Sequence, residues 1–265
     1  MDGAAVPVTP VLAFDIETVP DVAGLRRIHE IGPAVDDAGV LAWFAQRRRM
    51  ATGSDFMPHH LQQVVAIACV LRDAGGLRVW SIGEASDAEP ELVRRFFDGI
   101  ERYTPQLVSW NGSGFDLPVL QHRALIHGVP AAKYWDWGDE NRDFKFNNYL
   151  SRYHTRHLDL MDVLAQYQPR ANAGLDAMAR LCGFPGKLGM DGSEVAGAIA
   201  AGRIADVRNY CECDALNTYL VYLRFRLMRG EFDADHYARE IALVRERIAA
   251  SGAPHWREFI EKWDA

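Results

Sequence analysis

The sequence of 265 residues has few cysteines and no long apolar run. Four cysteines are too few for a disulfide scaffold, and Cys211 and Cys213 are too close for an easy bridge within one helix. Their spacing also differs from the two-residue spacing of zinc sites, so we interpret both as small buried apolar residues. No run reaches the roughly 18 apolar residues of a membrane helix, and the first residues lack the pattern of a secretory signal. We therefore expect a cytoplasmic protein without membrane contacts.

Positive charge is also scarce, since 29 basic residues against 36 acidic ones give a net charge of −7. Non-specific coating of nucleic acid depends on Lys and Arg that neutralise phosphates, and this balance argues against it. An enzyme that holds a few nucleotides through cations bound to its own carboxylates is compatible with this charge balance. Apolar residues at 49% and charged residues at 25% are close to the globular average, which excludes disorder, collagen and coiled coil.

Strand patterns fill the first half of the chain and helical patterns the second. We expect strands over residues 11–18, 64–71, 77–82, 107–110 and near 157–160. Helices are expected over residues 22–31, 35–49, 91–102, 116–127, 175–182 and 204–229, and again after 233. This order predicts a mixed sheet flanked by helices, an α/β fold. Without a linker or repeat, we expect one domain over 1–265, with a core over about 11–229 and a helical tail over 230–265.

Asp15 and Glu17 lie two residues apart in the first expected strand, so they project from the same face. Adjacent carboxylates raise each other's pKa, and a fold retains them where a cation or a proton relieves the repulsion. An isolated pair of this kind is commonly a solvated strand face. The apolar flanks, Phe14 and Ile16, favour a central strand and a metal site instead.

Two further segments carry polar side chains at informative positions. Asp116 follows the Asn111-Gly-Ser-Gly turn and begins a helix, where its alternative role is an N-cap. Tyr210 and Asp214 lie four residues apart and share a helix face. Taken alone, this last spacing is more typical of ordinary packing than of a site.

Together, Asp15-x-Glu17, the Asn-x-x-x-Phe-Asp motif that ends at Asp116, and Tyr210-x-x-x-Asp214 resemble the DEDD superfamily of 3′–5′ exonucleases, in its Tyr-containing subclass. The resemblance is closest to stand-alone bacterial proteins described as predicted PolB-like 3′–5′ exonucleases, and it covers about residues 11–229. It implies a ribonuclease H-like fold, with a five-stranded mixed sheet and helices on both sides. The motifs come without a polymerase domain, so the resemblance does not imply association with a polymerase.

The resemblance also implies a two-metal-ion mechanism, in which paired cations hold the attacking and leaving oxygens of a phosphoryl displacement. The expected ions are two Mg²⁺ or Mn²⁺ per site, which prefer oxygen ligands. Asp15 would bridge them, Glu17 and Asp214 would complete the site of the nucleophilic water, and Asp116 the other. Tyr210 would orient that water, because a free tyrosine with a pKa of about 10 is a poor base. The products would be nucleoside 5′-monophosphates.

The expected substrate is single-stranded nucleic acid, with DNA favoured over RNA because the resemblance is to proofreading domains; no protein partner is indicated. The basic, aromatic stretch 141–157 is the candidate for strand contact, through its cations and the rings of Phe146, Tyr149 or Tyr153. A solvated loop whose rings fill the core is an equally good interpretation. The individual substrate contacts that we expect are Thr18, Asn111, Phe115 and Arg152.

Two other functions remain open at this point. The first is a binding module that kept the fold without catalysis, which the intact set of acids disfavours. The second is a ribonuclease or endonuclease variant of the same fold, which Tyr210 disfavours. We interpret His59, His60, His122 and His127 as helix or turn residues rather than ligands. Arg47-Arg-Arg49 is a solvated helix end that could also contact phosphate.

Overall fold

The computed structural model describes residues 9–264, so the N-terminal segment considered above as a secretory signal lies outside the described residues. At the centre is a five-stranded sheet in the order β3-β2-β1-β4-β5. Its strands are β1 (Val11–Pro20), β2 (Gln62–Asp73), β3 (Gly76–Ser81), β4 (Gln106–Ser109) and β5 (His157–Asp159). The first three are antiparallel neighbours, whereas β4 and β5 run parallel to β1. The predicted mixed sheet is confirmed, with strand ends within two residues of most predicted ones.

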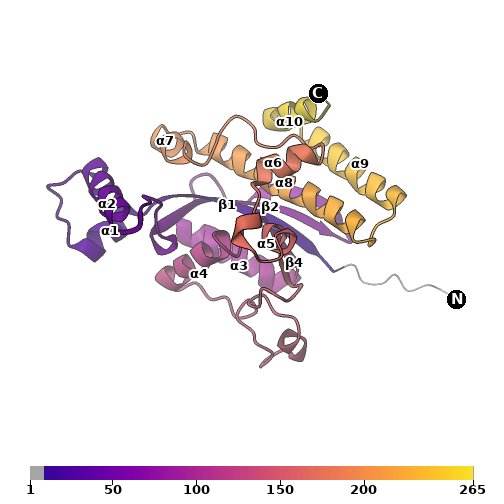
Figure 1. Cartoon of the computed structure of the whole chain (residues 1–265), viewed down its shortest axis with the longest axis horizontal. Coiled ribbons are helices and arrows are strands. Elements are labelled where there is room, and N and C mark those ends of the chain that lie inside the picture. Colours follow the sequence, from indigo (N-terminus) through magenta and orange to yellow (C-terminus); the bar gives the residue numbers. More distant parts are fainter. Residues whose placement is uncertain (1–8, 265) are drawn as a thin grey trace.

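Helices cover both faces of the sheet (Figure 1). On one face lie α3 (Glu89–Tyr103) and α4 (Asp116–His127), which pack on Leu12, Phe14 and other side chains of alternate β1 positions. The long α8 (Ile204–Met228) lies on the other face. There β1 and β2 present Ala13, Ala66 and Ala68, all fully buried, and such small side chains let a helix approach a sheet closely. The side chains of α8 are thereby brought close to β1.

The remaining helices extend the layer on the α8 side. They are α5 (Leu160–Leu164), α6 (Leu175–Leu181), α7 (Val195–Ala200), α9 (Ala234–Ser251) and α10 (Pro254–Asp264). Trp256 and Phe259 of α10 belong to the same buried cluster as α8. The sequence prediction contains no counterpart of α7, because six residues are too few to display a helical period. Within residues 9–264, no helix combines the length and hydropathy needed to cross a membrane.

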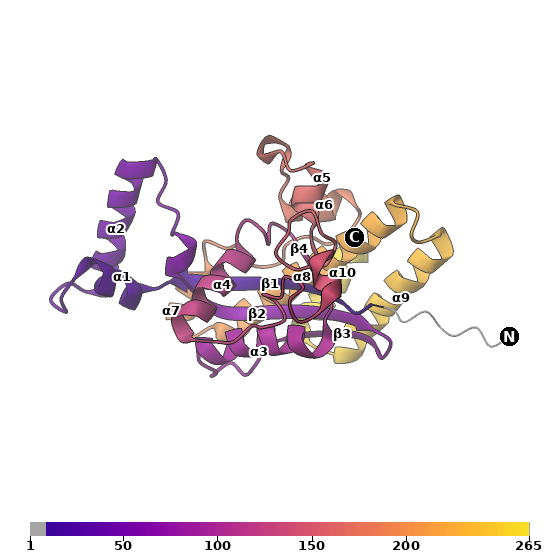
Figure 2. The ribbon, with the colours of Figure 1, turned by 90° about the horizontal axis from the view of Figure 1, so that it is seen from below.

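Between β1 and β2, the chain forms a projection that we call the arm, residues 21–61. Its two helices, α1 (Val22–His29) and α2 (Asp37–Thr52), stand away from the sheet (Figures 1 and 2). The arm has a small apolar cluster of its own, made of Leu25, Val40, Phe44 and Leu61. At its base, the Asp21 N–H donates a hydrogen bond of 2.8 Å to the Leu61 carbonyl. The buried Arg123 of α4 is paired with Asp21 at 2.7 Å and so ties the base to the body.

Candidate active site

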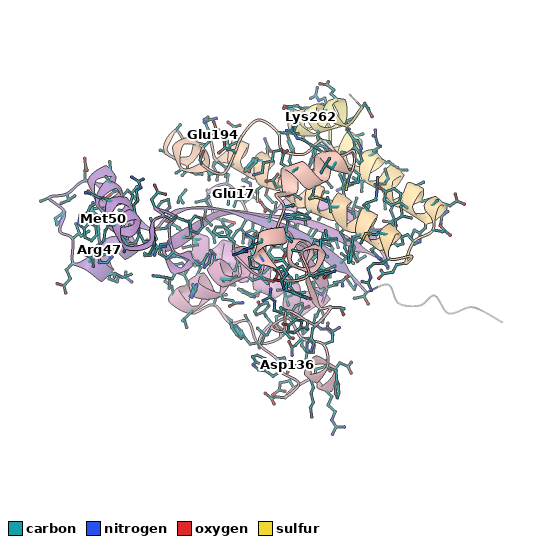
Figure 3. The ribbon with its side chains drawn as sticks, viewed as in Figure 1. Glu17, Arg47, Met50, Asp136, Glu194 and Lys262 are labelled. Atoms are coloured by element: carbon teal, nitrogen blue, oxygen red, sulfur yellow. The ribbon has the colours of Figure 1, made fainter. Side chains whose placement is uncertain are left out.

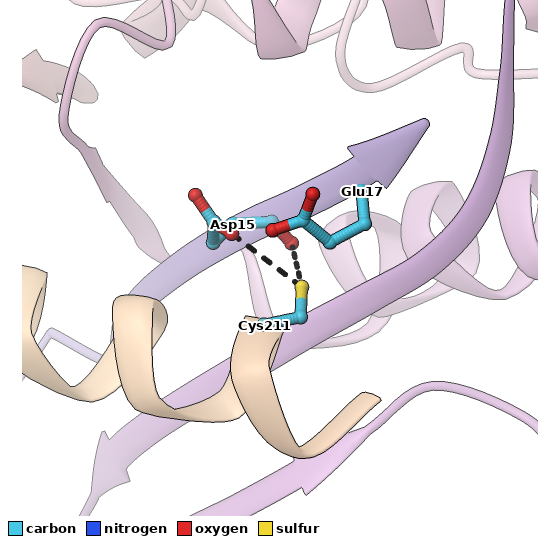
Figure 4. Close-up of side chains that lie close together, drawn as sticks. All are labelled: Asp15, Glu17 and Cys211. Atoms are coloured by element: carbon cyan, nitrogen blue, oxygen red, sulfur yellow. Dashed lines mark hydrogen bonds between the residues drawn. The ribbon is translucent and has the colours of Figure 1, made fainter. Parts of the chain in front are cut away.

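Strand β1 presents Asp15 and Glu17 toward Cys211 of α8 (Figure 4), and Figure 3 places Glu17 near the middle of the molecule. Both belong to the alternate positions whose apolar members pack against that helix. Glu17 is only 8% exposed, so the interpretation of this pair as a solvated strand face is wrong. A bulge between Glu17 and Thr18 ends the regular pairing with β2 at this point. Single oxygens of Asp15 and Glu17 and the sulfur of Cys211 lie within 4.8 Å of one another (Figure 4).

Helix α8 contributes Tyr210 and Asp214, one turn apart and both buried. Oδ2 of Asp214 lies 3.4 Å from Nζ of Lys187. Its other oxygen, Oδ1, is buried and has no hydrogen-bond partner among the described residues. Buried polar atoms are nearly always paired, and a carboxylate oxygen left without a donor among other acids fits a cation. This set of oxygen donors therefore fits a divalent cation.

Asp116 comes from the opposite side of the sheet, as the first residue of α4. Phe115 occupies the N-cap position, so the interpretation of Asp116 as an N-cap is wrong. The preceding turn is tightly held, because a Cβ on Gly114 would collide with Oδ1 of Asn111. Asp159, at the end of β5, accepts the N–H groups of Asn111 at 2.9 Å and Ser113 at 2.8 Å. A parallel neighbour strand thus fixes the turn that carries Asp116.

The four acids lie close enough to repel one another. Burial raises the pKa of Asp15 well above its usual range, and the charges of Glu17, Asp116 and Asp214 raise it further. Burial raises the pKa of Glu17, and the charge of Asp214 raises it further. Burial raises the pKa of Asp116 to about 7. Burial also raises the pKa of Asp214, although the Lys187 ammonium opposes it. Cations or protons must therefore balance this group of acids at neutral pH.

Lys187 is a site residue that the sequence interpretation missed. Its ammonium donates a 2.5 Å hydrogen bond to the Tyr210 hydroxyl and lies 5.1 Å from the centre of that ring. The main chain of Lys187 is held on both sides, since its N–H donates to Asp176 at 2.7 Å and its carbonyl accepts from Lys262 of α10 at 2.8 Å. Only its place between Gly186 and Gly189 sets this lysine apart in the sequence.

Comparison with known proteins identifies the family to which the chain belongs. Residues 54–263 match the family described as "Predicted 3'-5' exonuclease related to the exonuclease domain of PolB". The chain belongs to this family. The predicted class of enzyme, a metal-dependent 3′–5′ exonuclease, is thereby confirmed. Because the match begins at residue 54, Asp15 and Glu17 lie outside it, and their assignment rests on the motif and the geometry.

Three polymerases are similar to parts of this exonuclease. It is 27% identical over 144 residues to a catalytic chain of DNA polymerase epsilon from Dictyostelium discoideum and 26% identical over 147 residues to one from Arabidopsis thaliana. Each match spans 52% of this chain and 6% of the polymerase. The family B DNA polymerase of the archaeon Pyrobaculum calidifontis superposes with a TM-score of 0.51 at 20% identity, covering 85% of this chain and 25% of that chain. This likeness confirms the ribonuclease H-like fold.

The predicted substrate contacts of the exonuclease lie in different surroundings. The Thr18 hydroxyl donates to Oε1 of Gln62 at 2.9 Å. Asn111 and Arg152 line one groove of about 620 Å³ with Trp135 and Trp137. The Arg152 guanidinium is 2.8 Å from Asp162 and stacks at 4.8 Å on Tyr167. Asp136, which lies between these two tryptophans in the sequence, is on the loop that projects at the bottom of Figure 3.

The stretch 141–157 has features of both interpretations given above, strand contact and a loop whose rings fill the core. Tyr149 is 2% exposed and its hydroxyl donates to the Pro105 carbonyl at 2.7 Å, so the expectation that this ring stacks on bases is wrong. The rings of Phe146 and Tyr153, by contrast, are 76% and 73% exposed. The loop thus fills the core with two rings, those of Phe144 and Tyr149, and offers two others to solvent.

The outcome differs among three other sequence interpretations. Both Cys211 and Cys213 are buried, but treating Cys211 as merely apolar is wrong, because its thiol contacts Asp15 at 3.3 Å from the main-chain oxygen and 3.5 Å from Oδ2. His127 is a helix residue as expected, 2.7 Å from Oε2 of Glu89. In the arm, Arg49 is paired with Asp55, and Arg47 lies over the Trp43 ring at 5.7 Å.

The metal-free exonuclease is expected to lose stability as the pH rises from about 5 to 8. Asp116 has a pKa of about 7 in the folded chain, against about 3.9 in an unfolded one. Between these values the folded state holds a proton that the unfolded chain releases, so the stability present at low pH is lost as the pH rises through 7. Thermal unfolding in chelator, measured at each pH unit, checks this slope.

The matched control is Asp116→Asn, which keeps the shape of the side chain and removes its titration. This variant is expected to show a shallower decline over the same pH range. A wild-type melting temperature that stays constant or rises between pH 5 and 8 would contradict the prediction.

Proposed function

We propose that the chain removes nucleotides from the 3′ end of single-stranded nucleic acid, DNA in preference to RNA, and releases nucleoside 5′-monophosphates. The observation that carries this proposal is the convergence of four acids from three elements, one of them Asp214, whose buried Oδ1 has no hydrogen-bond partner within residues 9–264. They are Asp15 and Glu17 of β1, Asp116 of α4 and Asp214 of α8. Family membership supports the reaction type.

In this proposal the four acids would hold two divalent cations, Mg²⁺ or Mn²⁺, and Asp15, which interacts with all three of the other acids, would be a ligand. When bound, such ions lower the pKa of a coordinated water and stabilise the charge of the displaced oxygen. Tyr210 keeps its proton, because burial and the neighbouring Asp214, Glu17 and Asp15 charges all raise its pKa. Its hydroxyl is therefore suited to orienting a water rather than to removing a proton. The proposal accordingly includes the Tyr-containing subclass.

Lys187 completes the site as a positioning residue. Its ammonium contacts both the Tyr210 hydroxyl and Asp214, and it opposes the rise in pKa that burial causes at Asp214. Asp176 and Lys262 hold its main chain from two different helices. We propose that Lys187 fixes the direction of the Tyr210 hydroxyl and keeps Asp214 ionised for metal binding.

We propose that the nucleic-acid strand passes over an aromatic cluster made of Phe56, His59 and Phe115. The Phe115 ring lies 6.0 Å from Phe56 and 5.7 Å from His59, centre to centre, and Phe115 directly precedes Asp116. Phe56 is half exposed, and its carbonyl accepts a 3.2 Å hydrogen bond from Arg48. Aromatic faces stack on bases of any sequence while cations bind the phosphates. Thr18, Asn111 and Arg152 are proposed as further contacts around the terminal nucleotides.

Digestion of matched DNA and RNA strands labelled at the 5′ end, with Mg²⁺ or Mn²⁺, tests the function. We expect a ladder that shortens from the 3′ end, faster for DNA, and mononucleotide products. Phe56→Ala is expected to slow digestion of long strands, whereas the control variant Met228→Ala, which truncates an exposed apolar side chain at the last residue of α8, leaves it unchanged.

Each alternative function has its own outcome in this assay. Absence of degradation with either metal would refute the exonuclease, and tight strand binding without turnover would indicate a binding module. Equal rates on DNA and RNA would refute the DNA preference. Cleavage of a circular single strand, which has no 3′ end, would indicate an endonuclease.

A further inference from the structure

A cysteine thiol lies among the carboxylates of the site. Sγ of Cys211 is 3.3 Å from the main-chain oxygen of Asp15 and 3.5 Å from its Oδ2, as Figure 4 shows. Glu17 supplies a third ligand atom, and all three lie within 4.8 Å of one another. Mg²⁺ and Mn²⁺ have little affinity for sulfur, whereas thiolates select zinc and similar softer ions. The proposed cations for hydrolysis therefore do not account for the position of this thiol.

The spacing of the ligand atoms suits a tetrahedral zinc ion. Zinc binds sulfur at about 2.3 Å and carboxylate oxygen at about 2.0 Å, which places the two ligands about 3.5 Å apart in a tetrahedron. Sγ of Cys211 and Oδ2 of Asp15 are 3.5 Å apart. Independently, Asp214 lies nearly one helical turn beyond Cys211, and its Oδ1 is buried without a hydrogen-bond partner among the described residues. The charge of Asp214 raises the pKa of both Asp15 and Glu17, so this oxygen belongs to the same group of acids.

We infer that Zn²⁺ binds Asp15, Glu17 and Cys211 and thereby inhibits the exonuclease. On binding, the S–H bond is replaced by a bond from sulfur to zinc, and the thiol proton leaves to solvent. Carboxylate oxygens held by zinc are withdrawn from the ions that support hydrolysis, and N/O/S sites bind Zn²⁺ more tightly than Mn²⁺. The inhibition rests on the proposed function, because it requires Asp15 and Glu17 to hold the ions of the reaction. The binding of zinc itself does not depend on the proposed function.

Cobalt(II) tests the thiolate bond without any assay of hydrolysis. A bond between cobalt and a thiolate gives a charge-transfer band in the near ultraviolet, which oxygen ligands do not produce. The full chain, freed of metal by a chelator and titrated with Co²⁺, is expected to develop this band to a plateau at one ion per chain. Added Zn²⁺ is expected to abolish the band. A wild-type protein without the band at saturating Co²⁺ would overturn the inference, whatever the variants show.

Two cysteine variants locate the ligand. Cys211→Ser is expected to lose the band. The matched Cys213→Ser is expected to keep it, since Cys213 is equally buried but does not belong to the group of ligand atoms that includes Asp15 and Glu17. A band that persists in Cys211→Ser would overturn the assignment. Circular dichroism checks that each variant is folded, and Cys211→Ala replaces Cys211→Ser if the latter is not.

Inhibition is measured as the Zn²⁺ concentration that halves digestion of a DNA strand in Mg²⁺, relative to each variant's own rate without zinc. Even an outer-shell partner is worth about 10–100-fold in metal affinity. We therefore expect Cys211→Ser to raise this concentration at least about tenfold, and an unchanged value would refute the inhibitory role. A protein that shows the cobalt band but digests no strand would refute the proposed function and leave the zinc site in place.

Discussion

Replacing Asp15 with alanine is expected to lower the rate of strand hydrolysis by more than about 10³-fold, because removal of even one positioned donor from a catalytic site costs about 10²–10³. The charges of all three other acids raise the pKa of Asp15, so its loss removes the one acid that interacts with every other member of the group that would hold the cations. Single-turnover digestion over a range of Mn²⁺ concentrations measures this loss. High Mn²⁺ is expected to restore little of the rate.

The same substitution is expected to leave the metal-free protein at least as stable as wild type at pH 8. Burial and three neighbouring acids disfavour the ionised Asp15, and alanine removes that unfavourable charge. Asp235→Ala, at an exposed position in α9, serves as the control for both measurements. A variant that digests strands at the wild-type rate would exclude Asp15 from the site, and one that is much less stable in chelator would show that Asp15 has a structural role.

Replacing Tyr210 with phenylalanine is expected to lower the rate by about 10²–10⁴-fold, the usual contribution of one positioned proton-bearing group. The ring and its packing remain, while the hydroxyl that bonds Nζ of Lys187 at 2.5 Å is lost. Because Tyr210 is not a proposed metal ligand, the Mn²⁺ concentration that gives half-maximal rate is expected to change little. Metal-titrated turnover of the variant measures both quantities.

Tyr222→Phe is the matched control, since its hydroxyl lies on the same helix but bonds Gln106 at 2.8 Å, at the opposite end of the sheet from the acids. This control is expected to keep the wild-type rate. If Tyr210→Phe also retained full speed, Tyr210 would be a packing residue only, and the four acids would remain as the site.

The sheet and the four acids could be predicted because their signals are local. Alternation along Phe14-Asp-Ile-Glu17 marks a strand with one apolar face, and that alternation also determines which side chains point toward α8. The Gly-rich turn before Asp116 and the helical spacing of Tyr210 and Asp214 are equally local. What joined them into one site in advance was the resemblance to a family, since no local pattern states that β1, α4 and α8 meet.

The features that escaped prediction depend on contacts between distant segments. Lys187 reaches the site only because helices α6 and α10 hold its loop, through Asp176 and Lys262. Whether the Cys211 sulfur faces apolar groups or a carboxylate depends on how closely α8 approaches β1. Tyr149 occurs in a basic, exposed stretch, yet its ring stacks on Tyr134 in the core. Composition describes a segment as a whole and cannot distinguish the rings that turn inward, Phe144 and Tyr149, from those that stay exposed.

The arm is inserted at the tip of a hairpin. Strands β1 and β2 are antiparallel neighbours whose pairing continues to Pro20 and Gln62, where a two-residue turn is the commonest connection. Replacing such a turn by about 40 residues raises the entropic cost of closing the hairpin by about 2–3 kcal/mol, which the arm's own apolar cluster offsets. An insertion that carries its own core, and whose two chain connections to its host lie side by side, is a module. Evolution or an engineer can lengthen, exchange or delete it while the register of the host sheet is preserved.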